Sequence, residues 1–171
     1  MRTSRNSGTV TAVCRKADPG LPKLVVETIN LVEDYGIEGD YHAGKLVRHR
    51  YLSEKDPDMP NNRQVLLVDT SILAALAGKG IHLEPGMLGE NILIQGISVM
   101  NLLPCSLLEV GEALLEISEI RKPCHQLNEM HPALLKAVVS NVDGKVRFQA
   151  GMLARILRGG RVQPGDLAAE L

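Results

Sequence analysis

The chain has 171 residues, of which 44% are hydrophobic and 23% charged, the composition of an ordinary single-domain globular protein. Its net charge of -1 excludes a global attraction to nucleic acid or to an anionic membrane, and no apolar run is long enough to span a bilayer. The polar N-terminus lacks a signal-peptide core, and the three cysteines are too few for a disulfide framework. We therefore expect a cytoplasmic protein with neither a nucleic-acid nor a membrane partner.

Aromatic residues make up only 2% of the chain, so the core must be built from Leu, Ile, Val and Met. Short alternating or β-branched segments predict strands at 9–14, 25–32, 63–69, 92–95, 107–110, 113–120, 146–150, 152–157 and 161–163. Helical spacing is confined to 71–77, capped by Asp69 or Thr70, and to 129–140. Many short strands with Gly-containing turns and few helices predict a mainly β fold, a closed or nearly closed β-barrel spanning residues 1–171.

Two glycine-rich loops interrupt this pattern, at 36–44 and 83–91. The first places Glu38, Asp40 and His42 between three glycines, which suits ligation or proton transfer but equally a tight, solvated, acidic turn. It lacks the Gly-Lys-Ser/Thr ending of a phosphate loop. The segment 45–62, basic at its start, predicts a long surface loop that either covers a site or is simply solvated.

The strongest chemical signal is Cys124. Pro123 cannot continue a central strand, so the strand at 113–120 should end there and present the thiol at its edge. Arg121 and Lys122 precede the cysteine and His125 follows it, a setting that favours the reactive thiolate. The alternative is a buried cysteine acting as a small hydrophobe, the role we expect for Cys14.

The order and spacing of several motifs resemble the MOSC domain, the C-terminal domain of molybdenum cofactor sulfurase, which also occurs as small stand-alone bacterial proteins. The matching segments are 36–40 with His42, 63–65, 85–91, 110–112, 121–124, Gly151 with Arg155, and 159–160 followed by 165–166. The resemblance covers about 30–168 of the chain. One departure is Met87, where the family often has Asp, so we expect no catalytic role at that position.

The resemblance implies a β-barrel that binds the pyranopterin molybdenum cofactor, with Cys124 as the thiolate ligand of molybdenum. It implies an oxidoreductase that reduces N-hydroxylated compounds. The residues expected to hold the cofactor are Gly39, Arg63, Glu90, Asn91, Arg121 and Arg155, together with the basic cluster of Lys45, Arg48 and Arg50. The expected proton donors are Glu38, Asp40, His42 and Glu90, with His42 and Asp40 favoured.

An alternative is a sulfur carrier that holds a persulfide on Cys124, supplied by a cysteine desulfurase. A weaker alternative is a zinc module using Cys124, His125, His131 and Cys105, although their spacings do not match common zinc patterns. No pyridoxal phosphate site is expected, because the aminotransferase-like domain that carries it is absent. The chain shows neither an Fe–S pattern nor a flavin fingerprint, so a reductase would take electrons from a separate protein, and a homodimer stays open.

Overall fold

The structure is a computed structural model that describes residues 6–171, apart from the side chain of Arg50. Its helices are α1 (Arg50–Lys55), α2 (Thr70–Gly78) and α3 (Leu134–Val138), with the 3-10 turns η1 (Val99–Asn101) and η2 (His125–Glu129). Its first strands are β1 (Ser7–Arg15), β2 (Leu24–Val26), β3 (Ile29–Val32), β4 (Gly36–Ile37), β5 (Val65–Asp69) and β6 (Ile92–Gln95). The later strands are β7 (Leu107–Val110), β8 (Ala113–Ile120), β9 (Val139–Val142), β10 (Lys145–Phe148), β11 (Met152–Arg158), β12 (Gly160–Val162) and β13 (Leu167–Glu170).

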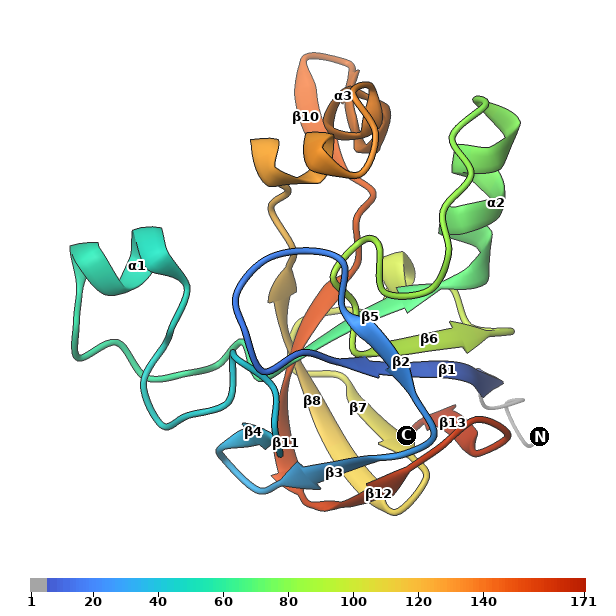
Figure 1. Cartoon of the computed structure of the whole chain (residues 1–171). Coiled ribbons are helices and arrows are strands. Elements are labelled where there is room, and N and C mark those ends of the chain that lie inside the picture. The colour runs from blue at the N-terminus through green and yellow to red at the C-terminus, as the bar shows by residue number, and fades with distance from the viewer. Residues whose placement is uncertain (1–5) are drawn as a thin grey trace.

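Seven strands of the described chain close into a barrel in the order β13-β7-β8-β11-β5-β6-β1, confirming the predicted fold class. Antiparallel pairing of β1 with β13, in which Ser7 lies opposite Ala169, closes the ring. Figure 1 shows the barrel with α2 on its upper right, an arm carrying α1 on the left, and a small lobe containing α3 and β10 at the top. Strands β3, β4 and β12 form a separate small sheet at the bottom.

The pair β5–β6 is parallel, and helix α2 makes the crossover between the two strands. Helix α2 contacts both strands and buries Ile72 and Leu76, so every residue of β5 is buried. Asp69 caps the helix as predicted, since its carboxylate accepts hydrogen bonds from the backbone N–H groups of Ser71 and Ile72. Its second oxygen accepts from Val99 N at 2.7 Å, which anchors η1.

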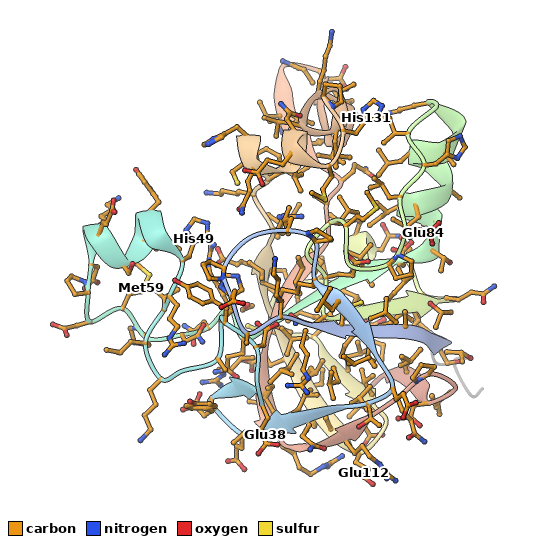
Figure 2. All side chains as sticks on the ribbon, viewed as in Figure 1. Glu38, His49, Met59, Glu84, Glu112 and His131 are labelled. Carbon is orange, nitrogen blue, oxygen red and sulfur yellow. The ribbon has the colours of Figure 1, made fainter. Side chains whose placement is uncertain are left out.

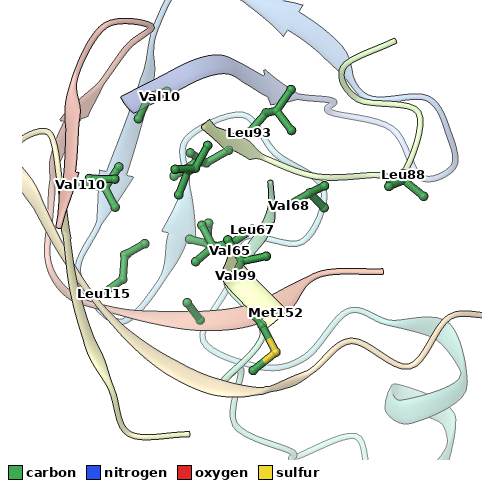
Figure 3. Close-up of a cluster of buried hydrophobic side chains, with 14 of the residues drawn as sticks. Val10, Val65, Leu67, Val68, Leu88, Leu93, Val99, Val110, Leu115 and Met152 are labelled. Atoms are coloured by element: carbon green, nitrogen blue, oxygen red, sulfur yellow. The ribbon is translucent and has the colours of Figure 1, made fainter. Parts of the chain in front are cut away.

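Aliphatic side chains fill the barrel interior, as the low aromatic content requires. Val10, Leu67, Val110 and Leu115 come from four different strands and meet in the close-up of Figure 3. All four are at most 1% exposed, and burying each such side chain contributes about 1.5–3 kcal/mol. The alternation of β8, in which Ala113, Leu115 and Ile117 are buried, follows from one face pointing into this core.

Three predicted elements differ from the structure. The segment 25–32 is two strands, because β2 pairs with β1 whereas β3 pairs with β12 and β4. The segment 45–62 is an arm rather than a plain loop: its two sides bond at Val47 N to Met59 O, at 2.9 Å, and α1 lies at its tip. The predicted helix 129–140 keeps only α3, because the chain turns into β9 at Val139 to pair with β10.

None of the helices in residues 6–171 has the length and apolar character needed to cross a membrane. The predicted hairpin at 107–120 is confirmed as β7 and β8, with Val110 paired to Ala113. Gly111 opens its two-residue turn at φ +55°, as a type II′ turn requires of its first central residue.

Candidate functional site

The site is assembled around the buried carboxylate of Asp40, which follows β4. Lys23 Nζ donates to both of its oxygens, at 3.1 and 2.9 Å, and both side chains lie almost completely out of solvent. Asn91 Nδ2 donates at 3.1 Å, and the backbone N–H groups of His42 and Lys16 donate at 3.0 and 3.3 Å. Burial lowers the pKa of Lys23, and Asp40 opposes that shift. One carboxylate thus joins three loops that are far apart in the sequence.

Asn91 carries this network into the barrel. Its Oδ1 accepts from the backbone N–H of Leu66 at 3.0 Å, and its Nδ2 also donates to the carbonyl of Cys14 at 3.1 Å. Cys14 is buried in β1 as expected, and burial, followed by the nearby Glu90, raises the pKa of its thiol to about 12. Cys14 is therefore a neutral thiol at physiological pH.

Cys124 lies where the sequence predicts, just beyond the end of β8. The strand ends at Ile120, and Cys124 is the half-buried residue that immediately precedes η2. No hydrogen bond involves its thiol among the residues that the structure describes. Cys124 is thus partly accessible.

Arg121 lies beside Cys124, and its Nη1 donates to the carbonyl of Ala150 at 3.2 Å. Burial lowers the pKa of Arg121, whereas the charges of Cys124 and Glu90 raise it. The guanidinium is therefore within electrostatic reach of both groups. The Nη2 atom is 4.0 Å from where a Cβ on Gly89 would lie, which places it against the 83–91 loop.

Glu90 is completely buried in that loop, and its two oxygens have different surroundings. Oε1 accepts the backbone N–H of Gly86 at 2.8 Å. Oε2 has no hydrogen-bond partner in the described part of the chain. Burial raises the pKa of Glu90, and this outweighs the opposing effects of the Gly86, Glu90 and Leu88 N–H groups and of Arg121.

Two histidines, His42 and His49, lie within electrostatic reach of Arg121. Burial and then Lys23 lower the pKa of His42 to about 4, although Asp40 opposes the shift. His49 precedes α1 on the arm, and partial desolvation followed by Arg63 and Arg121 lowers its pKa. In Figure 2 His49 lies where the arm approaches the body of the protein. Both imidazoles are neutral at physiological pH.

Two of the predicted arginines are already paired with glutamates of β8. Arg155 lies on the outer wall of the barrel, where it pairs with Glu116 at 3.3 Å across β11 and β8. Arg63 pairs with Glu119 near the end of β8, so its charge is already compensated, although it is near enough to His49 to affect that imidazole.

Glu38 and Gly39, two further predicted residues, contact other side chains of the protein. Glu38 is exposed, accepts from Asn30 Nδ2 at 3.2 Å, and lies at the lower edge of Figure 2, far from His49. Gly39 has φ +76°, and a Cβ there would lie 1.9 Å from Arg15 Nη1. A side chain of this protein therefore fills the space that the glycine leaves open. The side chain of Arg50, expected in the basic cluster, lies outside the described residues.

Sequence reasoning missed Lys23 and His49. A buried lysine gives no local signal, because only the partner Asp40 distinguishes it from the many lysines that stay in solvent. His49 belongs to the basic segment 45–50, whose composition is typical of an exposed loop. The residues of the zinc alternative are not brought together: within residues 6–171 no group of three or more His, Cys, Asp and Glu side chains could hold a metal ion.

The structure is a small closed β-barrel in which a half-buried cysteine follows a half-buried arginine at the end of β8, with the buried carboxyl group of Glu90 in a neighbouring loop. Residues 39–168 match the family model of the MOSC domain, so the chain belongs to the MOSC domain family. A search of curated proteins finds no match.

Solved structures share the fold at low identity. The YuaD protein of Bacillus subtilis superposes with a TM-score of 0.81 at 18% identity, covering 98% of this chain and 97% of that chain. YiiM of Geobacillus stearothermophilus gives 0.65 at 18% identity, covering 95% and 73%. YiiM of Escherichia coli gives 0.63 at 18% identity, covering 95% and 69%.

Proposed function

We propose that this protein binds the pyranopterin molybdenum cofactor through Cys124 and reduces N-hydroxylated compounds. The observation that carries the proposal is the half-buried Cys124 thiol, without a hydrogen bond in the described residues and beside Arg121 at the end of β8. A thiolate is a soft ligand suited to a redox-active metal. Membership of the MOSC domain family supports the same assignment.

The residues around Cys124 fit such a group. Within the described residues Arg121 donates one hydrogen bond, through Nη1, and keeps further N–H donors for a phosphate or a pterin oxygen. Glu90 Oε2 is a buried polar atom without a partner in the described chain, the state expected of an atom that meets a ligand. His49 adds an imidazole from the arm, so the cofactor would be held by Cys124, Arg121 and the loop 83–91.

When bound, the cofactor supplies a two-electron redox centre; the chain must position the N–OH group and manage protons. Asp40 acts by holding three loops in register, because both its oxygens are taken by Lys23, Asn91 and backbone donors. His42, neutral at physiological pH, orients a ligand through hydrogen bonds rather than by charge. Electrons come from a separate redox protein.

The proposal is tested by expression in a host that makes molybdenum cofactor, followed by measurement of molybdenum and pterin per chain. Cys124→Ser is compared with Cys105→Ser, which changes an exposed cysteine in the turn before β7. We expect about one molybdenum per wild-type chain and per Cys105→Ser chain, and loss of the metal in Cys124→Ser. A Cys124→Ser protein that keeps molybdenum and reduces hydroxylamine as well as wild type would contradict the proposal.

The second candidate is a sulfur carrier, favoured by the partial exposure of a thiol that nothing in the described chain occupies. In that case incubation with a cysteine desulfurase and cysteine places sulfane sulfur on wild type and on Cys105→Ser but not on Cys124→Ser. Neither metal nor pterin would then be required. Absence of sulfane sulfur from Cys124 would remove this candidate.

A further inference from the structure

Cleavage of an N–O bond consumes two electrons and two protons. For hydroxylamine the balance is NH2OH + 2 e− + 2 H+ → NH3 + H2O. The N–O bond breaks, one proton joins the departing oxygen to make water, and the other proton binds the nitrogen. A separate redox protein, or a chemical reductant in its place, supplies the electrons. A group next to the bound substrate must protonate the oxygen, because hydroxide is a poor leaving group.

The two donors favoured by the sequence do not suit this task. Asp40 is held as the anionic partner of Lys23, with its oxygens occupied by several donors, so it has no free lone pair facing a substrate. His42 has a pKa of about 4 and carries no transferable imidazolium proton near neutral pH.

Glu90 has the geometry of a neutral carboxylic acid. The backbone N–H of Gly86 donates to Oε1, which fits the carbonyl oxygen of a carboxylic acid, the better acceptor of its two oxygens. Oε2 is buried and lacks a donor among the described residues. An ionised Glu90 would leave negative charge on this buried atom, at a cost of several kcal/mol that Arg121 and the nearby backbone N–H groups offset only in part, while the neighbouring Lys23 is already paired with Asp40. A proton on Oε2 removes that charge. The resulting hydroxyl group has no acceptor in the described chain, so it can donate to a ligand.

The loop that carries Glu90 is close to Arg121, which precedes Cys124 by three residues. Gly89, the residue before Glu90, faces the Nη2 end of Arg121. A ligand bound to Cys124 and Arg121 therefore meets the loop that carries Glu90.

We propose that Glu90 is carried as a neutral carboxylic acid with its proton on Oε2, and that it donates this proton to the departing hydroxyl oxygen of an N-hydroxylated substrate. This donor role rests on the proposed reductase function. The neutral state of Glu90 is a property of the chain itself and can be measured without cofactor or turnover.

The first test compares wild type with Glu90→Gln, in cofactor-free protein at pH 7, by infrared difference spectroscopy. The wild type is expected to show the C=O stretch of a protonated carboxyl group, shifted in D2O and absent from Glu90→Gln. Glu84→Gln is the matched control, because Glu84 is exposed in the same loop (Figure 2) and its substitution should leave the band unchanged. Absence of the band from wild type overturns the proposal.

The second test uses protein loaded with molybdenum cofactor, hydroxylamine as substrate and reduced methyl viologen as electron source. Glu90→Gln keeps the shape and a hydrogen-bond donor at the Oε2 position, so molybdenum content should match wild type while turnover falls 10²–10⁴-fold, the usual contribution of a general acid. Glu84→Gln should turn over like wild type. Equal turnover by Glu90→Gln overturns the donor role alone, whereas a loaded wild type that reduces no N-hydroxylated compound overturns the proposed function and the donor role together.

Discussion

Replacement of Asp40 by Asn tests how much the buried ion pair of Asp40 with Lys23 contributes to the free energy of unfolding. The substitution keeps the side-chain shape but removes the charge that compensates Lys23, whose Nζ lies 2.9 and 3.1 Å from the two carboxylate oxygens in a buried environment. Breaking a buried ion pair from one side typically costs about 3–5 kcal/mol, because the remaining charge is left without a partner. That is a large part of the about 5–15 kcal/mol by which a domain of this kind is stable.

The assay is urea unfolding followed by circular dichroism at pH 7. With a slope of about 2 kcal/mol per molar urea, a loss of about 4 kcal/mol lowers the midpoint by about 2 M. The loss should shrink as pH rises, since burial already lowers the pKa of Lys23 and an unpaired Lys23 escapes the penalty by losing its proton.

Two matched variants decide the interpretation. Asp18→Asn changes an exposed aspartate and should alter the free energy of unfolding by no more than about 0.5 kcal/mol. The double variant Asp40→Asn with Lys23→Met removes both charges and should recover part of the loss. A loss below about 1 kcal/mol in Asp40→Asn, or no recovery in the double variant, would refute the ion-pair argument.

Two further predictions concern stability. The pKa of His42 is lowered to about 4 in the folded state, so between about pH 4 and 6.5 the unfolded chain binds more protons than the folded chain. The contribution of His42 to the free energy of unfolding is therefore complete above pH 6.5. It is lost as the pH falls toward 4, by up to about 3 kcal/mol. Unfolding across this range should show a steeper slope in wild type than in His42→Gln, which keeps the smaller contribution of His49, and a His42 resonance that titrates near pH 6.5 would contradict the prediction. Gly86→Ala should destabilise by at least about 2 kcal/mol, because Gly86 has φ +90° and a Cβ would lie 2.2 Å from the Lys23 carbonyl oxygen. Gly78→Ala, at the end of α2 with nothing within 4 Å of the added Cβ, should instead stabilise by about 0.5–1 kcal/mol, and equal thermal midpoints for the two variants would refute the steric argument.

The barrel follows from the sequence because its signals are local. Alternation makes β8 a strand wherever it finds a partner, Gly111 sets the turn before it, and Pro123 ends it and leaves Cys124 at the edge. Asp69 caps α2 through donors two and three residues away. Such interactions span a few residues, so the sequence determines them without knowledge of the rest of the chain.

The site depended on contacts that no local pattern records. The segment 25–32 forms two strands rather than one because β2 pairs with β1 and β3 pairs with β12. A local sequence pattern does not record these pairings. The roles of Lys23, Asp40 and Glu90 depend on burial and on which groups lie next to each side chain. The carboxylate of Asp40 is surrounded by donors and holds loops together. The carboxyl group of Glu90, with a buried oxygen that has no partner in the described chain, is the one we propose to keep a proton. The sequence by itself thus determined most of the barrel strands, the cap and the position of the cysteine, but not β13, which closes the barrel. Only the tertiary structure decided the charge state and the partners of the groups around it, because desolvation and Coulomb energy are set by distance in space rather than by distance along the chain.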